Sequence, residues 1–181
     1  MKRKSTSSVS ESFAYYGPTP KHFTPQGGFC MSAFALIQDK RGNTLLIKPR
    51  NARKWAEKWL PNVKLMNADR LKTFKNGWTF PASYIREGET PEVTLHRIVG
   101  EQLGVRSYHI ARQKLYNFYD PSYMFPGKMH WDYCFVFKIS IPSQSIKSQW
   151  VSTAKFVDVS KLAMSDFSSA QGELAQTLRL L

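Results

Sequence analysis

The sequence predicts an α/β sandwich built on a mixed β-sheet, and three observations support this fold class. An apolar stretch of strand character precedes the most regular helix pattern, aromatic strands follow that helix, and a second helix pattern closes the chain. Strands on both sides of a central helix favour helices layered on a sheet. With 181 residues, of which 42% are hydrophobic and 14% aromatic, the chain is long enough for one such domain.

The first elements follow an irregular start. Residues 1–28 are rich in Ser and then in Pro and Gly, so we expect a flexible N-terminal tail that leads into an extended arm. Residues 29–38 predict a buried strand, 39–43 a turn and 44–48 a second strand, which together make a β-hairpin. We expect one domain over residues 29–181.

Two helices are predicted from capping residues and apolar spacing. Asn51 precedes a short apolar stripe that Pro61 ends. The stripe contains Ala52, Trp55, Ala56, Trp59 and Leu60. Thr90 and Pro91 start the second helix, and Gly104 ends it. Its stripe contains Leu95, Ile98, Val99 and Leu103.

The second half of the chain predicts three strands and a terminal helix. Residues 114–119 and 131–139 have aromatic strand patterns, and residues 155–159 indicate a last short strand. From about residue 166 to residue 181 the spacing predicts a helix. That helix would bury Leu174, Leu178 and Leu181.

Charge is distributed unevenly. The net charge of +13 favours a polyanionic partner or simply a basic surface. Residues 29–77 hold 11 basic against 3 acidic side chains, and we expect a basic insertion at about 49–77. Residues 78–105 form the one acidic stretch, which is typical of a metal site beside phosphate-attracting charge and equally of a solvated helix.

The lack of long apolar segments and the positions of the cysteines predict an intracellular protein. No apolar run approaches the roughly 20 residues of a membrane-spanning helix, and the basic start has no apolar signal segment after it. We therefore expect a cytoplasmic protein without membrane contact. Cys30 and Cys134 lie in apolar runs without partners at metal-ligand spacing, so we interpret both as small buried apolar residues.

One segment carries a recognisable pattern. Residues 78–105 read WTFPASYIREGETPEVTLHRIVGEQLGV, which aligns with G-x5-E-x7-R-E-U-x-E-E-x-G-U, where U is aliphatic. The matching positions are Glu89, Arg97, Val99, Glu101, Gly104 and Val105. The segment resembles the Nudix box. The resemblance implies the Nudix α/β/α sandwich and hydrolysis of a pyrophosphate linked to a nucleoside, with Mg²⁺ or Mn²⁺ held by helix carboxylates.

The segment also departs from this pattern. Ser83 replaces the glycine, Ile98 the first helix glutamate and Gln102 the last. Positions 98, 101 and 102 are expected to share one helix face, where only Glu101 keeps its charge and Gln102 offers an amide oxygen. Each lost unit charge removes roughly 4 kcal/mol of attraction per unit of cation charge, for charges ~4 Å apart at an effective dielectric of ~20. We therefore expect a weak or absent metal site and no resident cofactor.

The alternative is an active, metal-dependent pyrophosphohydrolase. By resemblance, its catalytic residues would be Glu101, Glu89 and Arg97. The plainer interpretations are an Arg97–Glu101 helical ion pair and an Arg97–Glu89 contact that fixes loop to helix. Whether the protein is an enzyme stays open at this point, and the missing carboxylates weigh against it.

The basic insertion has two interpretations. Lys54 and Lys58 could bind nucleic-acid phosphates while Trp55 or Trp59 stacks on bases. Otherwise both tryptophans pack inward and the lysines face water, which is the more common arrangement.

A second candidate ligand wall follows the first aromatic strand. By resemblance, this region shapes a nucleoside pocket, to which Tyr119, Tyr123, Phe125 and His130 would contribute. His130 is also interpreted as a structural hydrogen-bonding group.

Together these observations predict a Nudix-fold domain, catalytically impaired, that binds a phosphate-bearing ligand such as a nucleotide or single-stranded RNA. A protein-interaction domain that uses exposed aromatic residues is a third hypothesis, and a homodimer stays open.

Overall fold

The computed structural model describes residues 28–60, 68–121, 127–142, 146–168 and 171–180. Every structural statement below refers to these residues. The predicted N-terminal tail lies almost wholly outside them.

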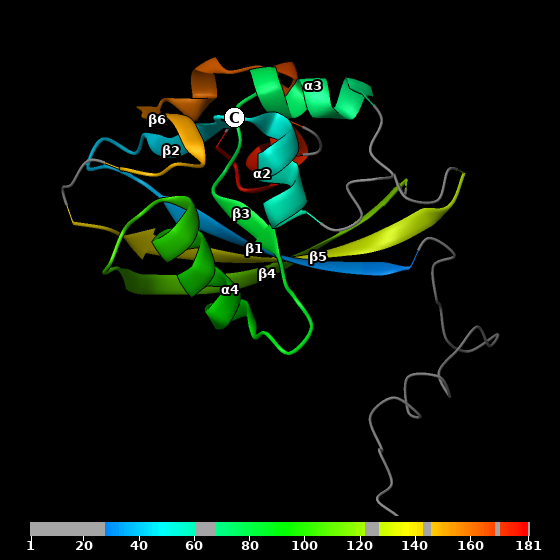
Figure 1. The fold of residues 1–181 in the computed structure, drawn as a ribbon, viewed down its shortest axis with the longest axis horizontal. Coiled ribbons are helices and arrows are strands. Elements are labelled where there is room, and N and C mark those ends of the chain that lie inside the picture. The colour runs from blue at the N-terminus through cyan, green and yellow to red at the C-terminus, as the bar shows by residue number, and fades with distance from the viewer. Residues whose placement is uncertain (1–27, 61–67, 122–126, 143–145, 169–170, 181) are drawn as a thin grey trace, which may run out of the picture.

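A four-stranded mixed sheet forms the centre of the domain (Figure 1). Its strands are β1 (Phe29–Ile37), β3 (Ala82–Tyr84), β4 (His109–Pro121) and β5 (Met129–Ser140), in the order β3-β1-β5-β4. β1 runs parallel to β5 and antiparallel to β3, and β4 runs antiparallel to β5. The predicted mixed sheet is confirmed.

The predicted hairpin is wrong. β2 (Thr44–Pro49) pairs with β6 (Val151–Val157) in a separate antiparallel two-stranded sheet, and only an isolated Gln38–Thr44 bridge links the two ends of the turn. β1 already pairs with β3 on one edge and β5 on the other, so it has no edge left for β2. β6 also begins four residues earlier than the strand predicted at 155–159.

The predicted central helix covers one face of the sheet. It consists of α4 (Pro91–Arg97) and a π-helical continuation, η2 (Ile98–Gln102). Thr90 caps it by accepting a hydrogen bond from the Val93 N–H at 3.3 Å, and Gly104 ends it with φ of 71°. The predicted stripe is fully buried against odd-numbered residues of β1 and β5. This core includes Leu95, Ile98, Val99, Leu103, Ala33, Ala35, Ile37, Phe137 and Ile139.

A second helical layer packs on the opposite face, as the predicted α/β/α sandwich requires. It contains the 3₁₀ turns η3 (Val159–Lys161) and η4 (Met164–Asp166) and the helix α5 (Gln171–Thr177). Leu174 is buried there, and Leu178 is partly buried. The single helix predicted over 166–181 is therefore broken and shorter, and Leu181 lies outside the described residues.

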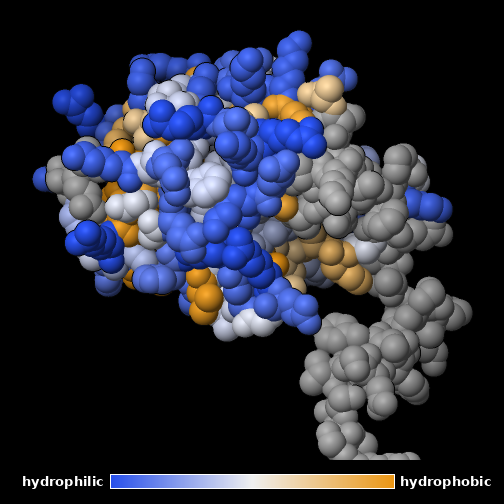
Figure 2. All heavy atoms as spheres, viewed as in Figure 1, coloured by the Kyte–Doolittle hydropathy of each residue, from blue (hydrophilic) through white to orange (hydrophobic). Residues whose placement is uncertain are grey.

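The basic insertion forms two helices with a small core of their own. α2 (Ala52–Trp59) begins at Asn51, whose side chain accepts from the Lys54 N–H at 3.0 Å as predicted, and α3 (Ala68–Asn76) packs against it. Trp55 and Trp59 are buried, and the Trp55 ring lies 5.4 Å from that of Phe74. Inward packing is confirmed, so these tryptophans do not present their rings to an extended nucleic-acid strand at the surface. The surface seen over the helices is mainly hydrophilic (Figure 2).

None of the helices in the described ranges is long and apolar enough to cross a membrane.

Candidate functional site

The strongest polar contact of the box joins its helix to the preceding loop. Arg97 grips Glu89 with two charge-assisted hydrogen bonds, from Nε to Oε1 at 2.8 Å and from Nη2 to Oε2 at 2.7 Å. Glu89 also accepts from the Thr94 hydroxyl at 2.7 Å and from the Arg86 N–H at 3.1 Å. Hydrogen bonds from Arg97, with help from Thr94 and Arg86, lower the pKa of Glu89 to about 2. Arg97 and Glu89 thus fix the loop that precedes the helix to the helix itself.

Ser83 extends this network toward the sheet. Its hydroxyl accepts from Arg97 Nη1 at 2.9 Å and lies 3.2 Å from the Trp59 carbonyl, to which it can donate. The guanidinium also donates from Nη2 to the Tyr84 carbonyl at 3.0 Å, and it lies 5.6 Å from the Trp59 ring. A glycine at position 83, as in the family pattern, has no side chain that could make the first two contacts. The serine has become part of the scaffold.

The box positions 98, 101 and 102 do not share one face, contrary to the expectation. Ile98 and Gln102 are completely buried, whereas the Glu101 side chain is 50% exposed. The helix widens to π geometry over this stretch, with the Leu103 N–H bonded to the Ile98 carbonyl at 3.1 Å. Over this wider turn Ile98 and Gln102 face the core, whereas Glu101 faces outward.

Gln102 acts as a backbone clamp. Its Oε1 accepts from the Ala82 N–H at 3.2 Å, and its Nε2 donates to the Ala82 carbonyl at 3.0 Å. β3 is an edge strand, so the amide of Gln102 satisfies two outward backbone groups as another strand would. A glutamate could accept from the N–H, but its carboxylate could not donate to the carbonyl. The amide oxygen expected to serve as a weak metal ligand is therefore occupied.

Glu101, the retained acid of the box, forms an ion pair with Lys58. Lys58 Nζ lies 3.0 Å from Glu101 Oε2, and it also lies 5.7 Å and 5.9 Å from the Trp59 and Trp150 rings. The expected Arg97–Glu101 ion pair is wrong, because Arg97 points to Glu89 instead. The negative charge of Glu101 is balanced by a lysine from the insertion.

The insertion docks on the box through the end of α2. The last carbonyls of a helix have no partner within it, and here the Lys58 carbonyl accepts from Arg86 Nη2 at 3.2 Å while the Trp59 carbonyl faces the Ser83 hydroxyl. Lys58 therefore reaches Glu101 from a helix that is itself anchored to the box.

The residues of the box do not fit a Mg²⁺ or Mn²⁺ centre of the kind the family pattern implies. Such ions need several hard anionic oxygens, and position 98 supplies a buried aliphatic side chain, position 102 a neutral amide whose oxygen already accepts a hydrogen bond, and position 101 a paired carboxylate. Within the described ranges, the grouping of His, Cys, Asp or Glu that could hold an ion lies elsewhere, at Cys30, His130 and Asp132.

A pocket of about 130 Å³ opens on the other face of the sheet. Even-numbered residues of β1, β4 and β5 form its floor, and the insertion and α5 form its walls. The lining includes Ser32, Phe118, Asp120, His130, Asp132 and Cys134, with Trp55 and Phe74 from the insertion. The indole Nε1 of Trp55 is buried without a hydrogen-bond partner among the described residues. The pocket thus combines aromatic walls with several polar groups.

The predicted ligand-binding residues divide between this pocket and the surface. His130 lines the pocket, as expected. Tyr119 does not, because it lies one position out of register with Phe118 and Asp120, is 45% exposed and packs edge-on against Trp131 at 6.0 Å. Tyr123 and Phe125 lie outside the described residues. Lys54 is exposed on α2, and Lys58 is held by Glu101.

Burial perturbs the acid and thiols of the pocket floor. It raises the pKa of Asp132 despite hydrogen bonds from Cys30 and Ser32. Burial, reinforced by the Asp132 charge, raises the pKa of the Cys30 and Cys134 thiols well above the usual range. Groups that are desolvated this strongly stay neutral unless an opposite charge compensates them.

Sequence reasoning missed Cys30 and Asp132 as a cluster with His130. Contrary to the expectation of a small buried residue, Cys30 is only partly buried and its thiol lies beside His130 and Asp132. One signal was available, because His130, Asp132 and Cys134 alternate along a strand and so must share a face. The partner from β1 depends on the parallel β1–β5 pairing, which brings Cys30 opposite Asp132.

Comparisons with known proteins were made against families, curated sequences and solved structures. The NUDIX domain family matches residues 28–178, and no curated protein matches. The fold is similar to a UDP-X diphosphatase, with a TM-score of 0.53 and 14% identity over 94% of this chain and 68% of that one. It is also similar to the E. coli dihydroneopterin triphosphate pyrophosphohydrolase, with a TM-score of 0.51 and 14% identity over 87% and 97% of the two chains. A third likeness is to the NUDIX domain of Shewanella oneidensis NrtR complexed with ADP ribose, with a TM-score of 0.50 and 18% identity over 94% and 96%.

Proposed function

The chain belongs to the NUDIX domain family, and from that premise we propose that it binds a nucleotide-linked, phosphate-bearing ligand without hydrolysing it efficiently. The observation that carries the proposal is the box helix, where the three positions that would hold cations are a buried Ile98, a Gln102 clamped to Ala82 and a Glu101 paired with Lys58. Cleavage of a pyrophosphate by this family pattern depends on cations that neutralise the phosphate oxygens, and a weak cation site removes that contribution.

The pocket on the opposite face supports the binding half of the proposal. An aromatic wall from Phe118 and Trp55 suits a base, and the carboxylates of Asp120 and Asp132 suit sugar hydroxyls or base N–H groups. The buried Trp55 Nε1 lacks a partner among the described residues, so a ligand acceptor that reached it would satisfy this donor. We place the phosphates toward the basic insertion, where Lys54 is exposed.

A nucleotide is favoured over single-stranded RNA by the tryptophans of the insertion. Recognition of single strands relies on aromatic rings that stack on successive bases. Trp55 and Trp59 are buried beneath α2 and cannot offer their faces to an extended strand. The basic surface alone would give weak binding that depends steeply on salt.

The enzymatic half is tested with a substrate panel in Mg²⁺ or Mn²⁺. The panel holds ADP-ribose, UDP-linked sugars, dinucleoside polyphosphates and nucleoside triphosphates, and it includes the ADP ribose and UDP-linked compounds that are named for two of the similar structures. We expect no turnover above the background of the metal alone. Hydrolysis of any member that is abolished in Glu101→Gln would overturn the proposal, because it would show a working box.

The binding half is tested on the same panel by thermal shift and calorimetry. We expect at least one nucleotide to bind, and Trp55→Phe to weaken that binding about 5- to 10-fold by removing one hydrogen-bond donor while keeping an aromatic ring. Trp59→Phe is the matched control, since its Nε1 is also buried and unpaired among the described residues but does not line the pocket. Binding by no member, or equal losses in both variants, would contradict the assignment of the pocket.

A further inference from the structure

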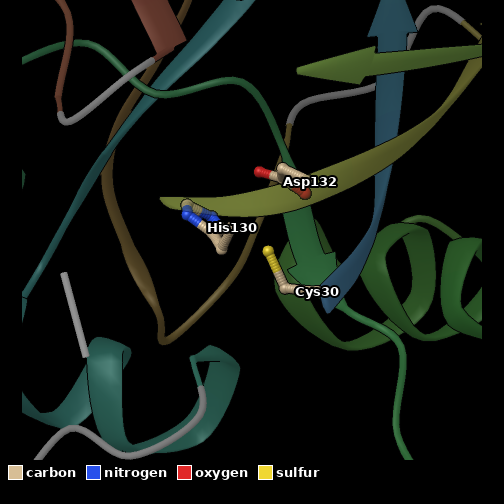
Figure 3. A group of neighbouring side chains, drawn as sticks. All are labelled: Cys30, His130 and Asp132. Carbon is tan, nitrogen blue, oxygen red and sulfur yellow. The ribbon is translucent and has the colours of Figure 1, made fainter. Parts of the chain in front are cut away.

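Three side chains that can all ligate a transition metal converge at one end of the pocket, where His130 and Asp132 line it and Cys30 lies beside them. Cys30 comes from the start of β1, and His130 and Asp132 come from the neighbouring strand β5 (Figure 3). One ligand atom from each lies within 4.8 Å of the other two. The Cys30 thiol points toward the two β5 side chains (Figure 3). Cys30 and Asp132 are direct partners in the parallel pairing, which fixes their spacing through the backbone.

His130 is already oriented as a metal ligand. Its Nδ1 lies 3.0 Å from the Asp120 carbonyl, and because a carbonyl only accepts, Nδ1 must carry the hydrogen. The lone pair of a neutral ring is then on Nε2. A histidine that donates its other N–H to a backbone carbonyl is the usual arrangement around protein metal ions, since that bond fixes the tautomer and the ring orientation.

Asp132 is a partly buried carboxylate that takes part in none of the salt bridges between the described residues. Ser32 Oγ donates to its Oδ1 at 3.3 Å, and the remaining neighbours are thiols and His130. A partly buried carboxylate of this kind is costly unless it is protonated or neutralised by a cation.

We propose that Cys30 Sγ, His130 Nε2 and the Asp132 carboxylate bind a Zn²⁺ ion. A thiolate, an imidazole and a carboxylate form a borderline-soft ligand set that suits Zn²⁺ and disfavours Mg²⁺. Tetrahedral bonds of about 2.0–2.3 Å place ligand atoms roughly 3.3–3.8 Å apart, so the three groups need to close by only about 1 Å. Three metal–ligand bonds form, the Cys30 thiol gives its proton to water, and no atom changes oxidation state.

The pocket gives the ion a route in and a remaining coordination position. His130 and Asp132 both line it, so solvent water or a ligand oxygen can complete the tetrahedron. This site is distinct from the box, since Cys30, His130 and Asp132 occupy the even-numbered face of the sheet and the box helix packs on the odd-numbered face. The inference holds whether or not the box is impaired.

The first test adds ZnCl₂ to the metal-free full chain and follows its melting temperature. At a hundredfold excess over Kd we expect a rise of about 5–10 °C that EDTA reverses, and no comparable rise with MgCl₂. Co²⁺ as a spectroscopic substitute should give a thiolate-to-metal charge-transfer band and the intense visible bands of a four-coordinate ion. A folded protein that shows neither a zinc-dependent rise nor a Co²⁺ spectrum would overturn the proposal, and this measurement needs no variant.

Variants then assign the ligands. Cys30→Ala and His130→Ala should each weaken Zn²⁺ binding more than about 100-fold. His109→Ala is the matched control, an exposed histidine of the same sheet, and it should stay within about threefold of wild type. Equal losses in the control and the ligand variants would overturn the assigned set.

Discussion

Two regions of one sheet treat their polar side chains in opposite ways. On the odd-numbered face, the box network of Arg97, Glu89 and Gln102 pairs each polar group with another part of the protein. On the even-numbered face, the pocket is lined by His130, by the partly buried Asp132 and by Trp55, whose Nε1 has no hydrogen-bond partner among the described residues. The first region has the character of a scaffold, and the second has the character of a binding site.

The contrast suggests that the box stabilises the fold, whereas the pocket is available to a ligand. The family pattern marks the box as the chemical centre, yet its substituted positions hold strands and the insertion together. Box variants should therefore change stability, whereas pocket variants should change binding. The following predictions test this contrast, starting with the largest effect.

Arg97→Ala should destabilise the domain by about 3–5 kcal/mol, because it leaves the partly buried Glu89 without its charge partner and removes bonds to Ser83 and Tyr84. Urea denaturation monitored by tryptophan fluorescence measures the loss. Arg53→Ala, which removes an exposed i,i+4 ion pair to Glu57, is the control and should change stability by less than about 1 kcal/mol. Similar effects in both variants would show that the box network is not a scaffold.

Gln102→Glu restores the family residue and should cost about 1–3 kcal/mol at neutral pH. The carboxylate would be fully buried and would face the Ala82 carbonyl without a hydrogen to donate. Gln113→Glu on the exposed surface of β4 is the matched substitution and should be nearly neutral. A variant as stable as wild type, or one that gains Mg²⁺ binding, would break the contrast between the two faces.

The stability of the domain should fall in acid because of Glu89. Its folded-state pKa of about 2 lies below its ordinary value of 4.5, so its contribution is complete above about pH 4.5 and is lost as the pH falls toward 2. We expect this contribution to be on the order of 1–2 kcal/mol. Unfolding free energies measured between pH 7 and pH 2.5 should decline less steeply in Glu89→Gln, and an identical slope in the two proteins would refute the assignment.

Lys58→Ala should have the smallest effect, less than about 1 kcal/mol, because the Lys58–Glu101 pair is partly exposed. The same variant sharpens the functional contrast. Removing the ammonium group should not create Mg²⁺-dependent hydrolysis, since Ile98 and Gln102 still point into the core. Hydrolysis that appears in Lys58→Ala would mean that the lysine alone blocks an otherwise competent site.

Local signals in the sequence predicted the helices better than the pairing of strands. The Asn51 cap, the Thr90–Pro91 start and the Gly104 end are properties of neighbouring residues, and the structure confirms all three. The hairpin failed because strand partners are chosen by the whole sheet, in which β1 lies between β3 and β5.

The site was predictable only in part for the same reason. The box and its substitutions are visible in sequence, and so is the burial of Ile98 on an apolar stripe. The π-helical turn over Ile98–Gln102 has no local signature, and neither does the Lys58 contact from the insertion. The Cys30–Asp132 contact joins residues about a hundred positions apart and depends on a parallel pairing.

The central claim is that too little negative charge faces the box helix to hold a catalytic cation. Mn²⁺ titration followed by electron paramagnetic resonance measures this directly, because bound Mn²⁺ loses the signal of the free ion. We expect wild type and Glu101→Gln to bind Mn²⁺ equally, with no site of submillimolar affinity that depends on Glu101. A submillimolar site in wild type that disappears in Glu101→Gln would contradict it.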